Sequence, residues 1–275
     1  IDLNTRERLF NYTIEDIQEI ITPMAQNGKE ALGSMGIDTP LAVLSDRPQL
    51  ISNYFKQLFA QVTNPPLDGI REEIVTDISL ALGKDRNIFS ITERQCRKLR
   101  IQNPVISNDD LEKIRSISIG SFKAETIEML YPKIKGMNGL EDALDDIIIQ
   151  ITKALDRGTN IIILSDRGVN KEFAPIPSLL ACSFVHHQMN RLRKRSYFDI
   201  IIESAEPRET HHFATLFGYG ASAINPYMVN EIIRLQVKQG FIKGMDEQKA
   251  VDNFNKAIGK GILKVMNKIG ISTLH

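Results

Sequence analysis

Residues 159–168 read TNIIILSDRG, a run of four apolar side chains between polar ends. An apolar run of this length, closed by a turn residue such as Gly168, is typical of a strand buried on both faces of a sheet. Upstream, residues 139–158 (GLEDALDDIIIQITKALDRG) place apolar side chains at helical spacing and end in Gly158, which favours helix termination. Together the two segments predict a helix that leads into a buried strand.

The same alternation of helix and strand continues downstream. Strands are predicted at residues 198–205 (FDIIIESA) and 221–226 (ASAINP), with a weaker one at 122–130 (FKAETIEML). Helices are predicted at residues 176–195, 209–220, 227–240 and 246–270. Such alternation is characteristic of βα units with a parallel sheet. We therefore expect an α/β fold, a degenerate (β/α) barrel-like domain with mostly parallel strands, with an open parallel α/β sheet as the alternative.

The first 120 residues carry weaker signals. Thr13 and Asn108 are predicted to cap the amino ends of two helices, because side chains of this kind accept hydrogen bonds from the first turn. The apolar run LAVLS, residues 41–45, predicts a short buried strand, and residues 48–62 predict a helix that ends before two prolines.

Composition and charge narrow the classes of function. The chain has 275 residues, and its 34 basic and 34 acidic side chains cancel. This balance lacks the electrostatic footprint of a nucleic-acid-binding protein or of one that binds an anionic membrane. The two cysteines, Cys96 and Cys182, favour a reduced, structural role, and no signal peptide or spanning segment is recognisable. We expect no nucleic-acid or membrane partner and a cytoplasmic location.

Polar side chains gather where the predicted strands end. They are Asp166, Arg167, Glu203, Glu206, Arg208 and Asn225. The carboxyl ends of parallel strands are where sites form in α/β folds, so carboxylates and arginines there could bind a small anion or act as acid and base. The other interpretation is an ion-pair network that fastens loops or a neighbouring domain. We favour the network, because no nucleophile or phosphate-loop motif accompanies these residues.

Four of the five histidines form two doublets, His186–His187 and His211–His212. Neighbouring side chains on a helix point about 100° apart, so one metal ion does not readily take both members of a doublet. We expect no bound metal. Instead, one histidine of each doublet should pack inward and donate to a carbonyl or carboxylate, with the other near the surface.

Four segments resemble the central domain of the glutamate synthase large chain. They are residues 24–73, 164–189 (LSDRGVNKEFAPIPSLLACSFVHHQM), 211–228 (HHFATLFGYGASAINPYM) and 260–273 (KGILKVMNKIGIST). The resemblance runs from about Arg8 to the last residues, and the motif GSMGIDTPLAVLS at 33–45 is its most specific part. Asn267 and Ile269 depart from the family's usual residues. The chain starts without Met, so we expect residues 1–275 to be one domain cut from a longer multidomain chain.

The resemblance implies a non-catalytic scaffold between two catalytic domains. The parent enzyme makes glutamate from glutamine and 2-oxoglutarate, with either ferredoxin or a nicotinamide nucleotide as electron donor. Its glutamine amidotransferase domain releases ammonia, and a barrel domain that holds FMN and an iron–sulfur cluster uses it. The resemblance assigns no cofactor to this chain itself. The central domain helps to form the ammonia passage.

The carboxyl-terminal tail lies, by the same resemblance, where the chain passes toward the flavin domain. Lys264, Lys268 and Ser272 are therefore candidate interdomain residues, and we expect the tail and the strand ends to form one contact surface. The alternative is a free-standing α/β-barrel enzyme, or a small-anion-binding protein, that uses Asp166, Glu203 and Arg208.

Overall fold

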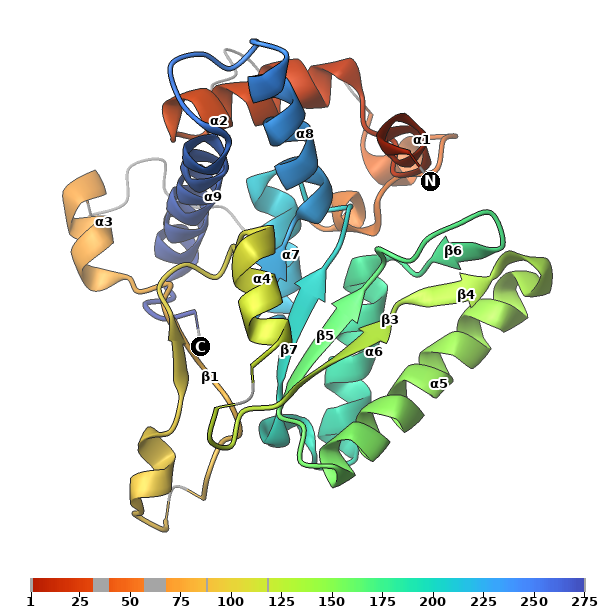
Figure 1. Ribbon diagram of the computed structural model, residues 1–275, viewed down its shortest axis with the longest axis vertical. Coiled ribbons are helices and arrows are strands. Elements are labelled where there is room, and N and C mark those ends of the chain that lie inside the picture. Colours follow the sequence, from red (N-terminus) through yellow and green to blue (C-terminus); the bar gives the residue numbers. More distant parts are fainter. Residues whose placement is uncertain (1, 32–39, 57–67, 88, 118, 275) are drawn as a thin grey trace.

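A four-stranded parallel sheet forms the centre of the computed structural model, which describes residues 2–31, 40–56, 68–87, 89–117 and 119–274 (Figure 1). In spatial order its strands are β3 (Ala124–Glu128), β5 (Ile161–Ser165), β7 (Asp199–Glu203) and β8 (Ala223–Asn225). A parallel bridge between Val105 and Ile224 extends the sheet beyond β8. The strands therefore lie side by side in the order in which the chain makes them.

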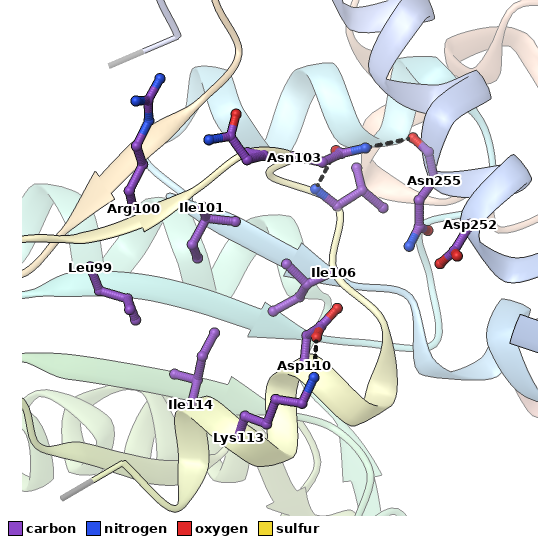
Figure 2. A pocket seen from close by; sticks show the side chains of 12 residues that line it. Leu99, Arg100, Ile101, Asn103, Ile106, Asp110, Lys113, Ile114, Asp252 and Asn255 are labelled. Carbon is purple, nitrogen blue, oxygen red and sulfur yellow. Dashed lines mark hydrogen bonds and ion pairs between the residues drawn. The ribbon is translucent and has the colours of Figure 1, made fainter. Parts of the chain in front are cut away.

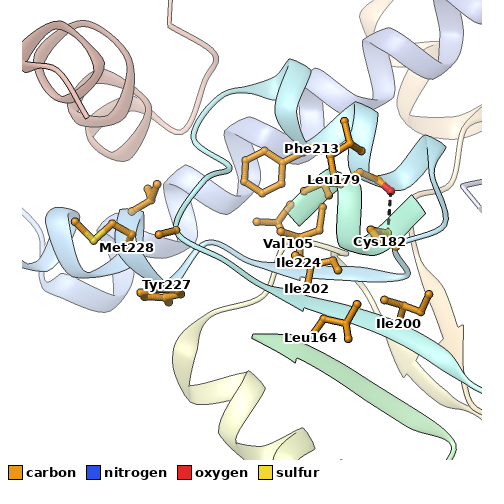
Figure 3. Close-up of a cluster of buried hydrophobic side chains, with 14 of the residues drawn as sticks. Val105, Leu164, Leu179, Cys182, Ile200, Ile202, Phe213, Ile224, Tyr227 and Met228 are labelled. Atoms are coloured by element: carbon orange, nitrogen blue, oxygen red, sulfur yellow. Dashed lines mark hydrogen bonds between the residues drawn. The ribbon is translucent and has the colours of Figure 1, made fainter. Parts of the chain in front are cut away.

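The three crossover helices cover one face of this sheet. They are α5 (Gly136–Asp156), α6 (Ser178–Arg191) and α7 (Thr210–Gly218). Figure 3 shows Leu164, Ile202 and Ile224 of the sheet packed among side chains of these helices, such as Leu179 and Phe213. Consecutive parallel strands whose crossovers all lie on one face have the winding of a (β/α) barrel rather than of a doubly wound sheet.

The opposite face packs against other parts of the chain. Ile161, Ile163 and Ile201 point to this side and contact Leu111 and Ile114 of α4 (Asn108–Arg115). An antiparallel pair, β1 (Leu80–Leu82) and β2 (Leu99–Ile101), completes this layer. Over the described residues no strand joins β3 to the bridge at Val105, so the sheet stays open. The predicted α/β domain with mostly parallel strands and barrel-like winding is confirmed.

The remaining helices form a further layer. The long helix α9 (Glu247–Ile269) packs against α2 (Thr22–Asn27), α7 and α8 (Tyr227–Lys238). Asp246 caps its amino end by accepting from the Lys249 amide at 2.7 Å, and Gly270, with φ of 79°, caps its carboxyl end. The shorter elements are α1 (Leu3–Leu9), a π-helix (Asp16–Ile21), α3 (Gly69–Val75), the antiparallel pair β4 (Leu130–Pro132) and β6 (Phe173–Pro175), and 3-10 turns at Ala42–Leu44, Ile51–Tyr54, Glu93–Cys96, Lys133–Lys135 and Arg195–Tyr197.

Three predictions for the first 120 residues are wrong. Residues 41–45 form no strand but a 3-10 turn at Ala42–Leu44, because among the described residues no neighbouring strand pairs with this apolar run. In the described part of residues 48–62 the helix is only the turn Ile51–Tyr54, and residues 57–62 lie outside the described residues. Ser107, rather than Asn108, caps α4 by accepting from the Asp110 amide. Over the described residues no helix is long and apolar enough to cross a membrane.

Candidate functional site

Glu203, at the carboxyl end of β7, is the centre of an ion-pair chain at the strand ends. Its side chain is 1% exposed; Oε1 accepts from Nε of Arg167 at 2.7 Å and Oε2 from Nη2 of Arg115 at 2.9 Å. Burial acts to raise the pKa of Glu203, but hydrogen bonds from Ser165 and the two arginines hold that pKa below its ordinary value. Glu203 is therefore a charged anchor, both of whose oxygens are bound within the chain.

The alternation of charges continues beyond Arg167. Nη1 of Arg167 lies 3.0 Å from Oε1 of Glu231 on α8, and Oε2 of Glu231 lies 2.7 Å from Nη2 of Arg6 on α1. The guanidinium of Arg167 also lies 4.2 Å from the ring centre of Tyr227, a cation–π distance. These contacts tie α1 and α8 to the loop that follows β5.

Asp166 precedes Arg167 but occupies a different, fully buried environment. Its Oδ2 accepts from Oγ of Ser204 at 2.5 Å, and the amide of Ala205 donates to both carboxylate oxygens at 3.2 Å. Burial raises the pKa of Asp166 to about 7; the Ser204 hydrogen bond opposes this shift and the charge of Glu206 adds to it. Asp166 therefore gains or loses its proton near neutral pH while its oxygens stay bound inside the chain.

Arg208 holds the amino-terminal segment, and among the described residues no ion pair or hydrogen bond joins it to Asp166 or Glu203. Its Nη1 and Nη2 donate to the carbonyls of Phe10 and Asn11 at 3.0 and 3.1 Å, and its Nε lies 3.3 Å from Oδ2 of Asp16. The guanidinium also stacks 4.5 Å from the ring centre of Tyr12. Arg208 thus clamps the turn between α1 and the following π-helix onto the sheet.

Glu206 and Asn225 also fasten neighbouring elements. Oε2 of Glu206 accepts from the amide and hydroxyl of Ser178, at the start of α6. Nδ2 of Asn225 donates to the carbonyl of Ile106 and to Oδ1 of Asn108, both at 3.0 Å. The predicted polar residues at these strand ends thus join their strands to other elements.

The structure does not bring the tail residues together with the strand ends. Nζ of Lys264 lies 2.5 Å from Oε2 of Glu30, and the carbonyl of Ser272 accepts from the amide of Asp77 at 2.8 Å. Lys268 is exposed on the last turn of α9. The tail therefore lies beside the segment that leads into β1, away from the carboxyl ends of β5 and β7 (Figure 1).

The histidine doublets behave as helix-packing residues. His212 is 4% exposed and its Nε2 lies 3.1 Å from Oε1 of Glu209, whereas His211 is exposed. The rings of His186 and His187 are inclined at 88°, with His186 half-buried and His187 exposed. Each doublet has an inner and an outer member, as expected, but only His212 has the expected carboxylate partner. Nδ1 of His186 instead accepts from Nε of Arg195 at 3.2 Å, and the absence of a metal stays a prediction.

A pocket that the sequence did not indicate lies between β2, α4 and α9 (Figure 2). Its volume is about 500 Å³, and Leu99, Ile101, Ile106 and Ile114 form its apolar wall. Asn255 of α9 also lines it; this side chain is 7% exposed, and its buried Oδ1 has no hydrogen-bond partner among the described residues. The pocket is therefore largely apolar, with the buried amide of Asn255 at its edge.

The sequence analysis missed three of the five residues of the ion-pair chain. Arg115, Glu231 and Arg6 lie on helices far from β7 in sequence, and each is a residue type that is common on any helix surface. Their partnership depends on how α1, α4 and α8 meet at the strand ends, which no local pattern encodes. Among the described residues Glu203, Arg167 and Arg208 are held in ion pairs, whereas Oδ1 of Asn225 is buried without a hydrogen-bond partner.

Comparison with known proteins relates the whole chain to one family. A family model described as the glutamate synthase central domain matches residues 5–275. The chain is 44% identical over 274 residues to the glutamate synthase [NADPH] large chain of Bacillus subtilis, which covers 100% of this chain and 18% of that protein. It is 43% identical over 269 residues to glutamate synthase [NADH] of Schizosaccharomyces pombe, covering 97% of this chain and 13% of that protein.

A ferredoxin-dependent relative is also similar. Ferredoxin-dependent glutamate synthase 2 of Synechocystis is 37% identical over 284 residues, covering 98% of this chain and 18% of that protein. The chain thus spans less than a fifth of the length of these relatives. Among solved structures, the flavin-binding domain of baker's yeast flavocytochrome b2 has a TM-score of 0.38 at 12% identity, covering 62% of this chain and 36% of that chain. This similarity is too weak to support a conclusion about fold or function.

Proposed function

This chain belongs to the glutamate synthase central domain family, and on that premise we propose that it is a non-catalytic interdomain scaffold. In the proposal it links a glutamine amidotransferase domain to an FMN-binding barrel in the same longer polypeptide and helps to form the ammonia passage between them. That parent polypeptide would make glutamate from glutamine and 2-oxoglutarate. The relatives that match this chain are five or more times its length, which supports the presence of such neighbours.

The observation that carries the proposal is the exposure of large apolar side chains. Phe89 is 91% exposed, Ile91 is 93% exposed and Ile134 is 96% exposed. On α3, Ile70 and Ile74 lie one turn apart and are each 77% exposed. Single exposed apolar residues are ordinary, but neighbouring pairs of this size favour contact surfaces for another protein domain.

The polar residues at the strand ends support a structural rather than a catalytic role for that part of the chain. Glu203 is bound by Arg115 and Arg167, and Arg208 is bound by backbone carbonyls and Asp16. A free-standing enzyme or small-anion-binding protein that used Asp166, Glu203 and Arg208 would need these groups to face a common cavity with unoccupied hydrogen-bonding capacity. Their engagement with separate elements favours the scaffold over this alternative.

The residues present do not suit FMN or an iron–sulfur cluster, so the proposal keeps both in the neighbouring domain. At the strand ends the oxygens of Asp166 and Glu203 are already bound by Ser204, Ala205, Arg115 and Arg167, so they are not free to hold a cofactor. Only two cysteines are present; Cys96 is exposed, whereas Cys182 is buried within α6 with a pKa raised by burial to about 12. They do not supply the set of thiolates that a cluster requires.

The test compares the two half-reactions in the parent polypeptide. We expect Phe89→Ser combined with Ile91→Ser to raise the ratio of ammonia released to glutamate formed by about threefold or more, because loss of apolar contacts weakens domain docking. Leu192→Ser, which removes a lone side chain that is 51% exposed at the end of α6, is the matched control and should leave the ratio unchanged. A normal ratio in the double variant would contradict the proposal.

A further inference from the structure

One edge of the central sheet is open. In the order of the sheet β3 is the outermost strand, and among the described residues nothing pairs with its outer side. A groove of about 650 Å³ runs along this edge, between β3 and β4 on one side and α5 on the other. An unpaired edge of a buried sheet is a template for an added strand, and natural proteins normally cover or blunt it.

The backbone groups that face the groove can be identified from the pairing with β5. The amide of Ile161 donates to the carbonyl of Lys123, and the amide of Met129 donates to the carbonyl of Ser165. Backbone groups of alternate residues in a strand point to opposite sides, so the odd-numbered residues of β3 face β5. The amides and carbonyls of Ala124, Thr126 and Glu128 therefore face the open edge.

The wall of the groove is strongly acidic. Asp142 and Asp146 project from α5 and Glu128 from β3, and all three side chains are exposed. Among the described residues the only ion pair of this group joins Asp142 to Lys135, at 3.5 Å between two exposed side chains. An ion pair of that kind contributes little, so the carboxylates remain available to a basic partner.

The spacing of the two aspartates matches a strand. Four residues of helix rise about 6 Å, which separates Asp142 from Asp146 along α5. Side chains on one face of a strand repeat every second residue, about 6.6 Å apart. A strand laid along β3 would therefore present alternate side chains to successive aspartates of α5. Leu130, Ile147 and Phe173, which also line the groove, would contact its apolar residues.

We propose that the open edge of β3 receives an extended segment of another domain of the same longer polypeptide, with Lys or Arg at alternate positions that pair with Asp142 and Asp146. The proposal rests on the proposed function as a scaffold, and it names the surface and the chemistry of one docking segment. Main-chain hydrogen bonds to Ala124, Thr126 and Glu128 give the segment its register. The aspartates select its charge.

Amide hydrogen exchange resolved residue by residue over β3 tests this in the 275-residue chain and in the parent polypeptide. In the short chain we expect the amides of Ala124, Thr126 and Glu128 to exchange rapidly and those of Glu125 and Ile127, which face β5, to exchange slowly. In the parent polypeptide the first three should slow by about tenfold or more, because they become hydrogen-bonded. The amides that face β5 are the internal control.

Charge variants test the chemistry of the segment. In the parent polypeptide, Asp142→Asn with Asp146→Asn should restore rapid exchange at the edge. Glu141→Gln with Asp145→Asn, which changes the same charge on a different face of α5, should not. Protection that persists in the first double variant would overturn the basic character of the segment.

Two further outcomes would overturn the proposal and are distinguishable from failure of the scaffold itself. Concentration-dependent protection of the edge in the 275-residue chain would assign the edge to a second copy. Rapid edge exchange in the parent polypeptide, together with slowed exchange at Phe89 and Ile91, would refute this docking site and leave the scaffold intact. Rapid exchange at both places would refute both proposals.

Discussion

Nη2 of Arg115 lies 2.9 Å from Oε2 of Glu203, so the last turn of α4 is fastened to the end of β7 although the two residues are 88 positions apart. The helix α4 crosses the face of the sheet that a closed barrel would enclose. Arg115 also donates to Oγ1 of Thr126 on β3. The side chain of Arg115 thus joins α4, which packs on this face of the sheet, to both β7 and β3.

Removing the charge of Glu203 should destabilise the chain strongly. Glu203→Gln leaves the guanidinium groups of Arg115 and Arg167 without their buried partner, which we expect to lower the free energy of unfolding by about 2–4 kcal/mol. Urea unfolding measures the effect. Asp109→Asn is the control, because Asp109 pairs with Arg234 at the surface, where such pairs contribute less than about 1 kcal/mol. Equal effects in the two variants would show that Glu203 is no anchor.

The stability of the chain should depend on the protonation of Asp166. In the folded chain the pKa of Asp166 is about 7, above its ordinary value of 3.8, so the folded state binds the proton more tightly than the unfolded state. This contribution to stability is complete below about pH 4 and is lost as the pH rises toward and through 7. Unfolding midpoints measured from pH 5 to pH 8 should therefore fall more steeply in the native chain than in Asp166→Asn. Parallel curves would contradict the assignment.

A buried and an exposed histidine, one from each doublet, should differ in their contribution to stability. His212 is buried and bonded to Glu209, so His212→Ala should lower the free energy of unfolding by about 1–3 kcal/mol through the lost contact and the space left behind. His187 is exposed, and His187→Ala should change it by less than about 0.5 kcal/mol. Thermal unfolding of the two variants under one set of conditions provides the comparison.

Apolar runs with burial on both faces made β5 and β7 predictable, because Ile and Leu in succession have few other stable places in a chain of this composition. The same signal failed at residues 41–45, where Val43 is 68% exposed and Leu44 is 71% exposed. An apolar run indicates a segment that is buried in the complete protein. It does not distinguish a strand of the sheet from a segment available to another domain.

In the candidate site, the sequence predicted the residues at the strand ends but not their partners on distant elements. Asp166, Glu203 and Asn225 follow from their places at strand ends, since parallel strands bring their carboxyl ends to one edge. That Arg208 turns to the amino-terminal segment instead depends on the carbonyls of Phe10 and Asn11, which belong to a turn with no strong pattern. Tertiary partners of this kind are fixed by packing between distant elements.

Replacing Asn255 with an apolar residue should stabilise the chain. Its Oδ1 is buried and has no partner among the described residues, so Asn255→Leu removes the cost of an unsatisfied acceptor, and we expect a gain of about 0.5–1 kcal/mol. Asn253→Leu is the matched control on the same helix. Nδ2 of Asn253 donates to the carbonyl of Ala25 at 3.0 Å, so its loss should cost about 1 kcal/mol. Opposite signs in urea unfolding are the expected result.

Lys268 tests whether the tail contributes to communication between domains. Lys264, one turn earlier on α9, is paired with Glu30, whereas Lys268 is exposed on the last turn and has no charged partner among the described residues. Its charge is therefore available to a neighbouring domain. In the parent polypeptide, Lys268→Glu should raise the ratio of ammonia released to glutamate formed by about twofold or more, because like charges then oppose docking. Lys256 is an exposed lysine in the middle of the same helix, and Lys256→Glu should leave the ratio unchanged.

Reversal of the charge of Lys268, near the carboxyl end of the helix, also costs about 0.3–1 kcal/mol of helix stability, so Lys268→Gln separates the effect on docking from the effect on the helix. A ratio that stays normal in Lys268→Glu would remove the tail from the interdomain surface.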